Sequence, residues 1–155
     1  MSDSLKVRLQ DFFGRRMASP RAHARMYRLT NGRIGHGSPP RSVLLLTVTG
    51  RKSGRQWTTP VAYFDIDGKR ALAATNIGRE GPPEWFRNIR ANPAVTTQVR
   101  AQVNQAMGRI TQGEEREQLW SRMKIGNPLY ERYELRSPDG IPVVVLEPIG
   151  EPGTR

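Results

Sequence analysis

The chain of 155 residues contains no cysteine. This absence excludes disulfide bridges, thiolate metal ligands and a cysteine nucleophile, and it fits a reducing cytoplasm. Apolar runs longer than a strand are missing too, and the N-terminus lacks the apolar core and cleavage site of a signal peptide. We therefore expect a cytoplasmic protein that is long enough to bury its own core.

Acidic residues are scarce: 14 Asp and Glu stand against 25 Lys and Arg, which gives a formal net charge of +11. The excess is concentrated in residues 1–41, with nine basic residues against two acidic ones. A cationic surface attracts nucleic acid, anionic lipid or an anionic small molecule, and charge alone does not separate these partners. Aromatic residues do not alternate with the basic ones as a stacking platform, so nucleic acid is not expected. A basic nucleic-acid- or membrane-binding protein without catalysis remains an alternative.

The common arrangements of hydrolytic and metal chemistry are also missing. His23 and His36 have no carboxylate nearby in sequence, and they are better explained as surface or loop residues than as metal ligands. The acidic cluster at 114–117 opens a predicted helix, where negative charge favours the helix dipole. Ser53 lacks the Gly-x-Ser-x-Gly context of a nucleophilic serine. Neither a metal site nor a protein-borne nucleophile is expected.

The most informative feature present is a basic turn between two apolar, β-branched runs, residues 43–49 and 57–66. Glycine at both ends lets backbone N–H groups converge on an anion, and Arg and Lys add charge suited to phosphate oxygens. A solvated hairpin tip is the alternative, because the spacing is not that of a P-loop and no helix follows. The turn consists of Gly50, Arg51, Lys52, Ser53, Gly54 and Arg55.

The basic head of the chain has helical periodicity. Leu5, Leu9 and Phe12 recur with Lys and Arg between them and predict an amphipathic helix over 5–17, which Ser19-Pro20 ends. A second helical piece is predicted up to Leu29. These pieces either pack on the folded domain or, over residues 5–29, make peripheral contact with an anionic membrane. We divide the chain into a basic N-terminal helical arm, 1–39, and a folded domain, 40–150.

From Pro40 onward the pattern predicts an antiparallel meander with short helices. Asp67-Gly68 is a two-residue hairpin signal, and Thr111-x-x-Glu114 resembles a capping box that opens a helix through Met123. Further strands are expected over 70–75, 95–99, 102–110 and 142–146, and further helices over 84–91 and 128–135. The fold class is mainly β with short helices (α+β), a small antiparallel barrel. The connections are too short for a doubly wound parallel sheet.

Three aromatic residues complete a candidate site. Trp85 follows a loop rich in Gly and Pro, and Tyr130 and Tyr133 form a pair on the last predicted helix. With the basic turn they would suit a phosphorylated planar cofactor: cations for phosphate, Trp for the ring and phenols for a substrate. Each also has a structural explanation, because Trp85 can be a core residue and the tyrosines can place their hydroxyls at a barrel rim.

Four motifs in order, Leu44–Gly54, Thr59-Pro60, Trp85–Asn88 and Ala91–Val95, resemble the deazaflavin (F-420)-dependent nitroreductase family of the flavin/deazaflavin oxidoreductase superfamily. Its members are mostly actinobacterial, and the resemblance covers residues 5–148. It implies a split β-barrel of the FMN-binding-like type. It also implies coenzyme F-420, a deazaflavin with a phosphate and a polyglutamate tail. The implied enzyme transfers a hydride from the reduced coenzyme to a quinone, activated enone or nitroaromatic acceptor.

The resemblance also implies site residues. The 51–54 segment matches the family's phosphate-binding loop, the 74–77 segment matches the backbone that lines the deazaflavin ring, and residues 84–88 match the region that covers the cofactor. The implied cofactor-binding residues are Arg51, Lys52, Ser53, Gly54, Arg55, Thr59, Pro60, Ala74, Thr75, Asn76, Ile77, Glu84, Trp85 and Asn88. Tyr130 and Tyr133 match tyrosines near the substrate pocket, where a phenol can donate a hydrogen bond or a proton. A deazaflavin passes two electrons as hydride, so no metal is needed.

The sequence departs from the nitroimidazole-activating member of this family. That member has basic residues at the positions of Trp57 and Ile77, and a further tyrosine near Asn127. We expect Arg55 to replace the lost charge in the turn. The departures argue against nitroimidazole activation and leave quinones and enones open. The physiological acceptor and the oligomeric state stay open as well, and an FMN-dependent oxidase or reductase on the same barrel is the alternative enzyme.

Overall fold

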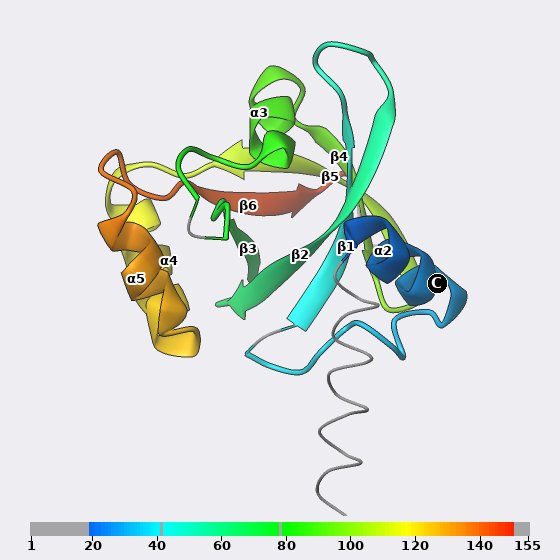
Figure 1. Cartoon of the computed structure of the whole chain (residues 1–155), viewed down its shortest axis with the longest axis horizontal. Helices are drawn as coiled ribbons and strands as arrows, with labels where there is room; N and C mark the ends of the chain where they lie inside the picture. Colours follow the sequence, from blue (N-terminus) through cyan, green and yellow to red (C-terminus); the bar gives the residue numbers. More distant parts are fainter. Residues whose placement is uncertain (1–18, 41, 78, 151–155) are drawn as a thin grey trace, which may run out of the picture.

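A computed structural model describes residues 19–40, 42–77 and 79–150. Its centre is a closed barrel of antiparallel strands in the order β1-β2-β3-β6-β5-β4 (Figure 1). The antiparallel barrel predicted from the sequence is therefore confirmed, while the helix predicted over 5–17 lies outside the described residues. The strands are β1 (Ser42–Thr49), β2 (Gln56–Ile66), β3 (Lys69–Ala73), β4 (Ala94–Val99), β5 (Gln102–Ile110) and β6 (Val143–Pro148).

Strand β1 is buried on both faces, which explains its continuous apolar sequence. Leu44, Leu46 and Val48 point into the barrel core, where they belong to one cluster of buried side chains. Leu45, on the opposite face, packs with Ala24 and Tyr27 outside the barrel. Alternate residues of a strand point to opposite faces, so a strand covered on both sides has apolar residues on both faces, as the run Val43–Leu46 does.

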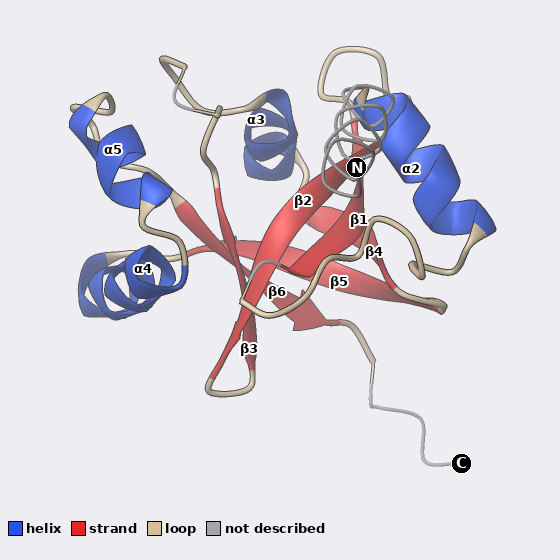
Figure 2. Ribbon diagram, turned by 60° about the horizontal axis from the view of Figure 1, so that its bottom comes forward, coloured by secondary structure: helices blue, strands red, loops and turns tan. Residues whose placement is uncertain are grey.

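Helices surround the barrel: α2 (Pro20–Leu29), α3 (Glu84–Ala91), α4 (Gly113–Gly126) and α5 (Leu129–Leu135). In Figures 1 and 2, α2 lies on one side, α4 and α5 lie on the other, and α3 lies between them. Phe86 and Ile89 of α3 pack into the barrel core. Ile89 comes so close to β5 that a Cβ at Gly108 would lie 2.9 Å from its Cγ2 atom.

A buried tyrosine of helix α2 makes several of its contacts with the barrel. The Tyr27 hydroxyl donates to the Val43 carbonyl at 3.0 Å and accepts from the Arg100 N–H at 2.8 Å. It also lies 3.1 Å from Nδ1 of His36, which is only 6% exposed. His36 is thus a buried loop residue. The division of the chain at residues 39 and 40 stays a prediction.

The capping box predicted at Thr111 and Glu114 is wrong. The Thr111 hydroxyl donates to the Val143 carbonyl at 2.8 Å, and the Thr111 N–H donates to the same carbonyl at 2.9 Å. Both bonds extend the pairing of β5 with β6, so this side chain is not available to cap a helix. Helix α4 begins at Gly113, after an N-cap residue, Gln112, that makes no side-chain capping bond.

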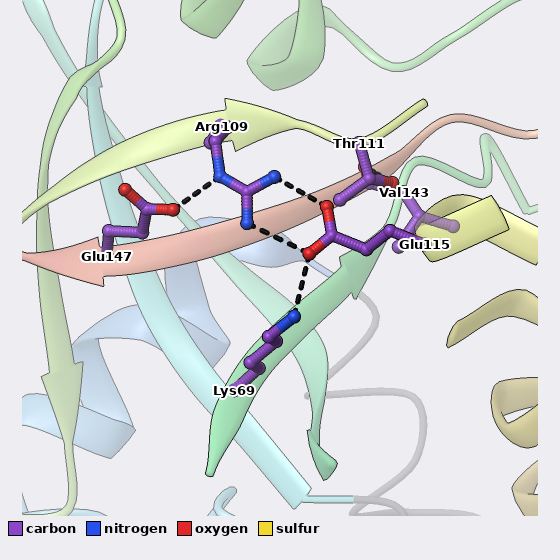
Figure 3. Close-up of polar contacts among 6 residues, drawn as sticks. All are labelled: Lys69, Arg109, Thr111, Glu115, Val143 and Glu147. Atoms are coloured by element: carbon purple, nitrogen blue, oxygen red, sulfur yellow. Dashed lines mark hydrogen bonds and ion pairs between the residues drawn. The ribbon is translucent and has the colours of Figure 1, made fainter. Parts of the chain in front are cut away.

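One ion-pair network links four elements on the outside of the barrel (Figure 3). Glu115 of α4 accepts from Arg109 of β5 at 2.6 Å and from Lys69 of β3 at 2.7 Å, and Arg109 also bonds Glu147 of β6. The hydrogen bonds from Arg109, and then from Lys69, hold the pKa of Glu115 at about 2. The network therefore connects α4 to three strands through a carboxylate that stays charged at low pH.

None of the helices in the described part of the chain combines the length and the apolar character needed to cross a membrane.

Candidate functional site

A cavity of about 850 Å³ opens where the β1–β2 turn, the N-terminal end of α3 and the start of α2 meet. We call it the turn cavity. It brings together predicted site residues from two distant segments of the chain. Its lining consists of Ser19, Pro20, Arg21, Val48, Gly50, Arg51, Lys52, Ser53, Trp57, Thr58, Thr59, Pro83, Glu84, Trp85 and Asn88.

The turn that borders this cavity closes on itself through backbone bonds. The Gly50 N–H donates to the Arg55 carbonyl at 2.7 Å, and the Gly54 N–H donates to the Gly50 carbonyl at 2.8 Å. Gly54 has a φ of +69°, in the left-handed region that glycine enters at little cost. Within the described chain the N–H groups of Lys52 and Ser53 have no hydrogen-bond partner. These two donors are therefore available to an anion.

Gly50 leaves space that any other residue would fill. A Cβ at this position would lie 2.8 Å from the Ser53 hydroxyl and 2.9 Å from Nε1 of Trp57. Both contacts are too short for a carbon atom, so a Cβ at Gly50 would force the side chains of Ser53 and Trp57 to move. Trp57, 47% exposed, thus lies over the glycine backbone and lines the cavity. Sequence reasoning missed Trp57 as a site residue. A large aromatic residue directly after a Gly-flanked turn could have indicated that it lies beside the turn.

Helix α3 fixes the position of Arg51. Nη1 of Arg51 donates to Glu84 at 2.8 Å and to Oδ1 of Asn88 at 2.9 Å, and the Arg51 N–H donates to the same Oδ1 at 3.1 Å. The hydrogen bond from Arg51 is the main reason that the pKa of Glu84 lies below its ordinary value. Glu84 therefore compensates the charge of Arg51. Lys52 and Arg21 make no ion pair with any described acidic residue.

Trp85 both packs against the core and lines the turn cavity. It packs edge-on against Phe86, with ring centroids 6.3 Å apart and planes at 84°, and it contacts the barrel core. It also lines the turn cavity. Its ring is only partly buried, so an apolar surface remains beside the basic turn.

Several predicted cofactor contacts do not line the turn cavity, namely Gly54, Arg55, Pro60, Ala74, Thr75, Asn76 and Ile77. Ala74 and Asn76 instead line a second cavity of about 1070 Å³, which extends to the loop between α5 and β6. The expectation that Arg55 supplies charge to the site is not supported by this geometry. Arg21 of α2 lies there instead.

The two tyrosines of α5 lie in a separate core cluster that includes Trp120. Tyr130 is 4% exposed and stacks on Trp120, with centroids 5.5 Å apart and planes at 10°. Burial raises the pKa of Tyr130 to about 12. Tyr133 is partly buried at the edge of the cluster. Neither tyrosine lines the turn cavity or the second cavity.

The described residues contain no cluster of three or more His, Asp or Glu side chains arranged to hold a metal ion. His23 lies beside the loop that follows α2, with Nε2 at 2.9 Å from the Gly35 carbonyl. The two histidines therefore have structural contacts in this region.

Comparison with known proteins gives consistent results. The family described as F420H(2)-dependent quinone reductase matches residues 19–148. An F420H(2)-dependent quinone reductase of Mycobacterium tuberculosis is 35% identical over 132 residues, which cover 81% of this chain and 87% of that protein. A solved F420-H2 dependent reductase, FDR-A, is 34% identical with a TM-score of 0.62, over 68% of this chain and 93% of the other. A structure described as a domain-swapped dimer is 28% identical with a TM-score of 0.64, over 94% and 100% of the two chains.

Proposed function

Because the chain belongs to the F420H(2)-dependent quinone reductase family, it is an oxidoreductase that uses coenzyme F-420, and we propose that it holds this coenzyme in the turn cavity. The observation that carries the proposal is the crowded glycine at position 50. The turn keeps a backbone surface that a Cβ would fill, beside two unpaired N–H groups and Lys52. This donor set suits a phosphate.

Each part of the cavity has a role in this proposal. Lys52 and the N–H groups of the turn would bind the phosphate, while Asn88 and Glu84 hold Arg51 in place beside it. Trp85 and Trp57 offer aromatic surface to the planar ring. The bound coenzyme supplies a hydride, and the family transfers it to a quinone. The protein's contribution is therefore to position the ring and to exclude water from it.

The strand end at Ala74–Ile77 remains our candidate for contact with the ring. Pro83 lines the turn cavity and its neighbour Pro82 lines the second cavity, so the two spaces approach one another at the start of α3. Ala74 and Asn76, which line the second cavity, would be the residues of this strand end that hold the ring. Tyr133 lines neither cavity, and the family resemblance is what makes it our candidate proton donor to the acceptor. Activated enones and nitroaromatics are proposed as further acceptors, to be tested with quinones in one panel.

Two cations of the same turn provide the test. Lys52 lines the turn cavity and Arg55 does not, while both are exposed and neither pairs with a described acidic residue. Titration of the protein with oxidised coenzyme, followed by its fluorescence, should show saturable binding. We expect Lys52→Ala to weaken it roughly tenfold or more, because a charged hydrogen bond contributes about 1.5–3 kcal/mol. Arg55→Ala is the matched control and should bind as the wild type does.

Absence of binding by the wild-type protein would refute the proposal, and equal losses in the two variants would place the phosphate elsewhere. The same titration with FMN tests the alternative cofactor, which this proposal predicts to bind far more weakly.

Peripheral contact with an anionic membrane remains a separate proposal. Most of the segment that suggested it, residues 5–29, lies outside the described residues. Within the described part, Met26 and Leu29 of α2 are 41% and 73% exposed beside arginines, which supports the proposal. Co-sedimentation with anionic and neutral vesicles tests it, and equal binding to both would refute it.

A further inference from the structure

Arg116 of helix α4 is a mostly buried cation in the lining of the second cavity. Its side chain is 17% exposed. Nη2 donates to the Ile141 carbonyl at 2.6 Å, and Nη1 donates to Glu117 at 2.8 Å. The guanidinium also lies over the ring of Trp120, 5.4 Å from its centroid. Three contacts from different directions therefore fix the position of this charge.

The contacts of Arg116 bring it to the strand end that we propose for the ring. The Ile141 carbonyl accepts from Arg116. The next carbonyl of the chain, that of Pro142, accepts from the Ala74 N–H at 2.8 Å. Ala74, Asn76 and Arg116 all line the second cavity. The cation and the strand end thus border the same space and are linked through two consecutive carbonyls.

The guanidinium of Arg116 keeps donors for a ligand. Arginine has five N–H groups, and the two bonds above use one on each Nη atom, so three have no partner in the described chain. Glu117 compensates the charge only in part, because its side chain is 67% exposed and solvent screens the pair. Arg116 can therefore donate to a further oxygen without losing the bonds that hold it.

The other charged residues of the second cavity are less fixed. Arg90 and Arg136 are exposed, and neither side chain makes a hydrogen bond or ion pair within the described residues. The acidic residues of the lining, Glu80, Glu117 and Asp139, are exposed as well. A charge that is held in place and withdrawn from water acts more strongly on a reacting group than a mobile, solvated one. Arg116 is the lining residue that meets this condition.

We infer that Arg116 is a catalytic residue that stabilises the negative charge formed on the acceptor oxygen during hydride transfer. The inference rests on the proposed function, because it needs the ring beside Ala74 and the acceptor in the second cavity. The quinone gains the electron pair of the hydride, one carbonyl oxygen becomes an oxyanion, and the coenzyme is oxidised. A proton then converts this anion to the hydroquinone. Arg116 acts before that proton arrives, so its role is separate from the one proposed for Tyr133.

Substitutions of Arg116 test this role. We expect Arg116→Met to lower kcat for quinone reduction about a hundredfold, as the loss of one oxyanion donor does in other enzymes, with coenzyme affinity unchanged. Arg116→Lys keeps the charge and should recover part of the rate. Arg122→Met is the matched control, since Arg122 is an arginine of the same helix that does not line the second cavity. Its kcat should equal that of the wild type.

Two further measurements separate catalysis from support of the fold. Guanidinium added at low concentration should restore activity to Arg116→Ala in a saturable way, because a free cation can occupy the space that the side chain leaves. In the presence of oxidised coenzyme, the ionised form of para-nitrophenol should bind the wild type more tightly than Arg116→Met, while its neutral form binds both equally. This titration follows the absorbance of the phenol and does not depend on turnover.

A lower Tm for Arg116→Met with kcat unchanged would overturn the inference, because the residue would then serve only the fold. Weaker coenzyme binding in this variant would overturn it too, since Arg116 would then act on the coenzyme. Equal losses of kcat in Arg116→Met and Arg122→Met, or no rescue by guanidinium together with equal binding of the ionised phenol, would have the same meaning. In each of these cases the proposed function stands, whereas a wild-type protein that binds no coenzyme would refute both.

Discussion

Asn88 accepts two hydrogen bonds from Arg51 through one oxygen, at 2.9 Å from the guanidinium and 3.1 Å from the backbone N–H. Asn88 is 7% exposed, so both bonds are partly shielded from water. The amide thereby ties helix α3 to the β1–β2 turn over a separation of 37 residues. The position of the turn is thus set by the helix that carries Trp85.

The first prediction concerns this amide. Asn88→Leu keeps the branched shape of the side chain but leaves the Arg51 N–H without an acceptor, and we expect a loss of about 1–3 kcal/mol of folding stability. Coenzyme affinity should fall as well, because Arg51 and the turn lose their support. Asn88→Asp retains an acceptor oxygen and should restore both quantities in large part. Urea unfolding and coenzyme titration measure the two effects, and a stability loss without any loss of affinity would separate Asn88 from the binding site.

A second prediction distinguishes the two tyrosines of α5. Tyr130 is buried with its pKa raised to about 12, so it is a poor proton donor, whereas Tyr133 lies at the edge of its cluster. We expect Tyr133→Phe to lower kcat for quinone reduction about a hundredfold with little change in Tm. Tyr130→Phe should lower stability by about 1 kcal/mol and leave kcat near the wild-type value. Steady-state kinetics and thermal unfolding of both variants measure these effects. A large loss of kcat in Tyr130→Phe, with kcat unchanged in Tyr133→Phe, would identify Tyr130 as the donor.

A third prediction follows from strain at Ile77. Its φ of 53° lies in the left-handed region, where an L residue costs about 1–2 kcal/mol and a β-branched one is rare. Ile77 is 81% exposed, so replacing it loses little buried area. Ile77→Asn should raise Tm by about 2–4 °C, because asparagine tolerates this conformation. Ile125→Asn is the control: that residue is also 81% exposed but lies in helix α4. A Tm no higher than that of the control would argue against strain.

A fourth prediction concerns acid stability. The pKa of Glu115 is about 2 in the folded chain, against an ordinary value of 4.5, so the unfolded chain takes up this proton first as pH falls. The contribution of Glu115 to stability is therefore complete above about pH 4.5 and is lost as pH falls toward 2. Glu115→Gln should be less stable than the wild type at neutral pH, with a shallower decline between pH 4.5 and 2. Glu117→Gln is the control on the same helix, and its decline should follow that of the wild type. Denaturation series across this range measure the effect, and parallel curves for Glu115→Gln and the wild type would contradict it.

The elements that the sequence predicted best are bounded by local signals. Helix α3 was predicted over 84–91 and is observed there, because Pro82-Pro83 sets its start and Asn92-Pro93 its end. The β2–β3 hairpin is confirmed for the same reason. Asp67 and Gly68 both have positive φ, 51° and 77°, as the two-residue turn requires. In each case a few adjacent residues determine the local backbone conformation.

The parts that were missed depend on barrel closure. Thr111 looks like a helix cap in sequence, but β6 places the Val143 carbonyl beside it, and the hydroxyl bonds there. Arg21 belongs to a helix that packs against β2, so its place in the turn cavity is not visible in the spacing of nearby residues. Arg55 is adjacent to the turn in sequence and yet does not line the cavity. Proximity in sequence therefore identified the turn but not all of its neighbours in space.

Every strand in the described part of the chain has a hydrogen-bonded neighbour on both sides, since β4 pairs with β1 and completes the ring. A sheet without an outer strand offers no row of unpaired N–H and C=O groups to another chain. Removal of any one strand would create two such rows at once, one on each former neighbour. Partial unfolding of this protein thus converts a surface that resists self-association into one with two sites for intermolecular β-pairing.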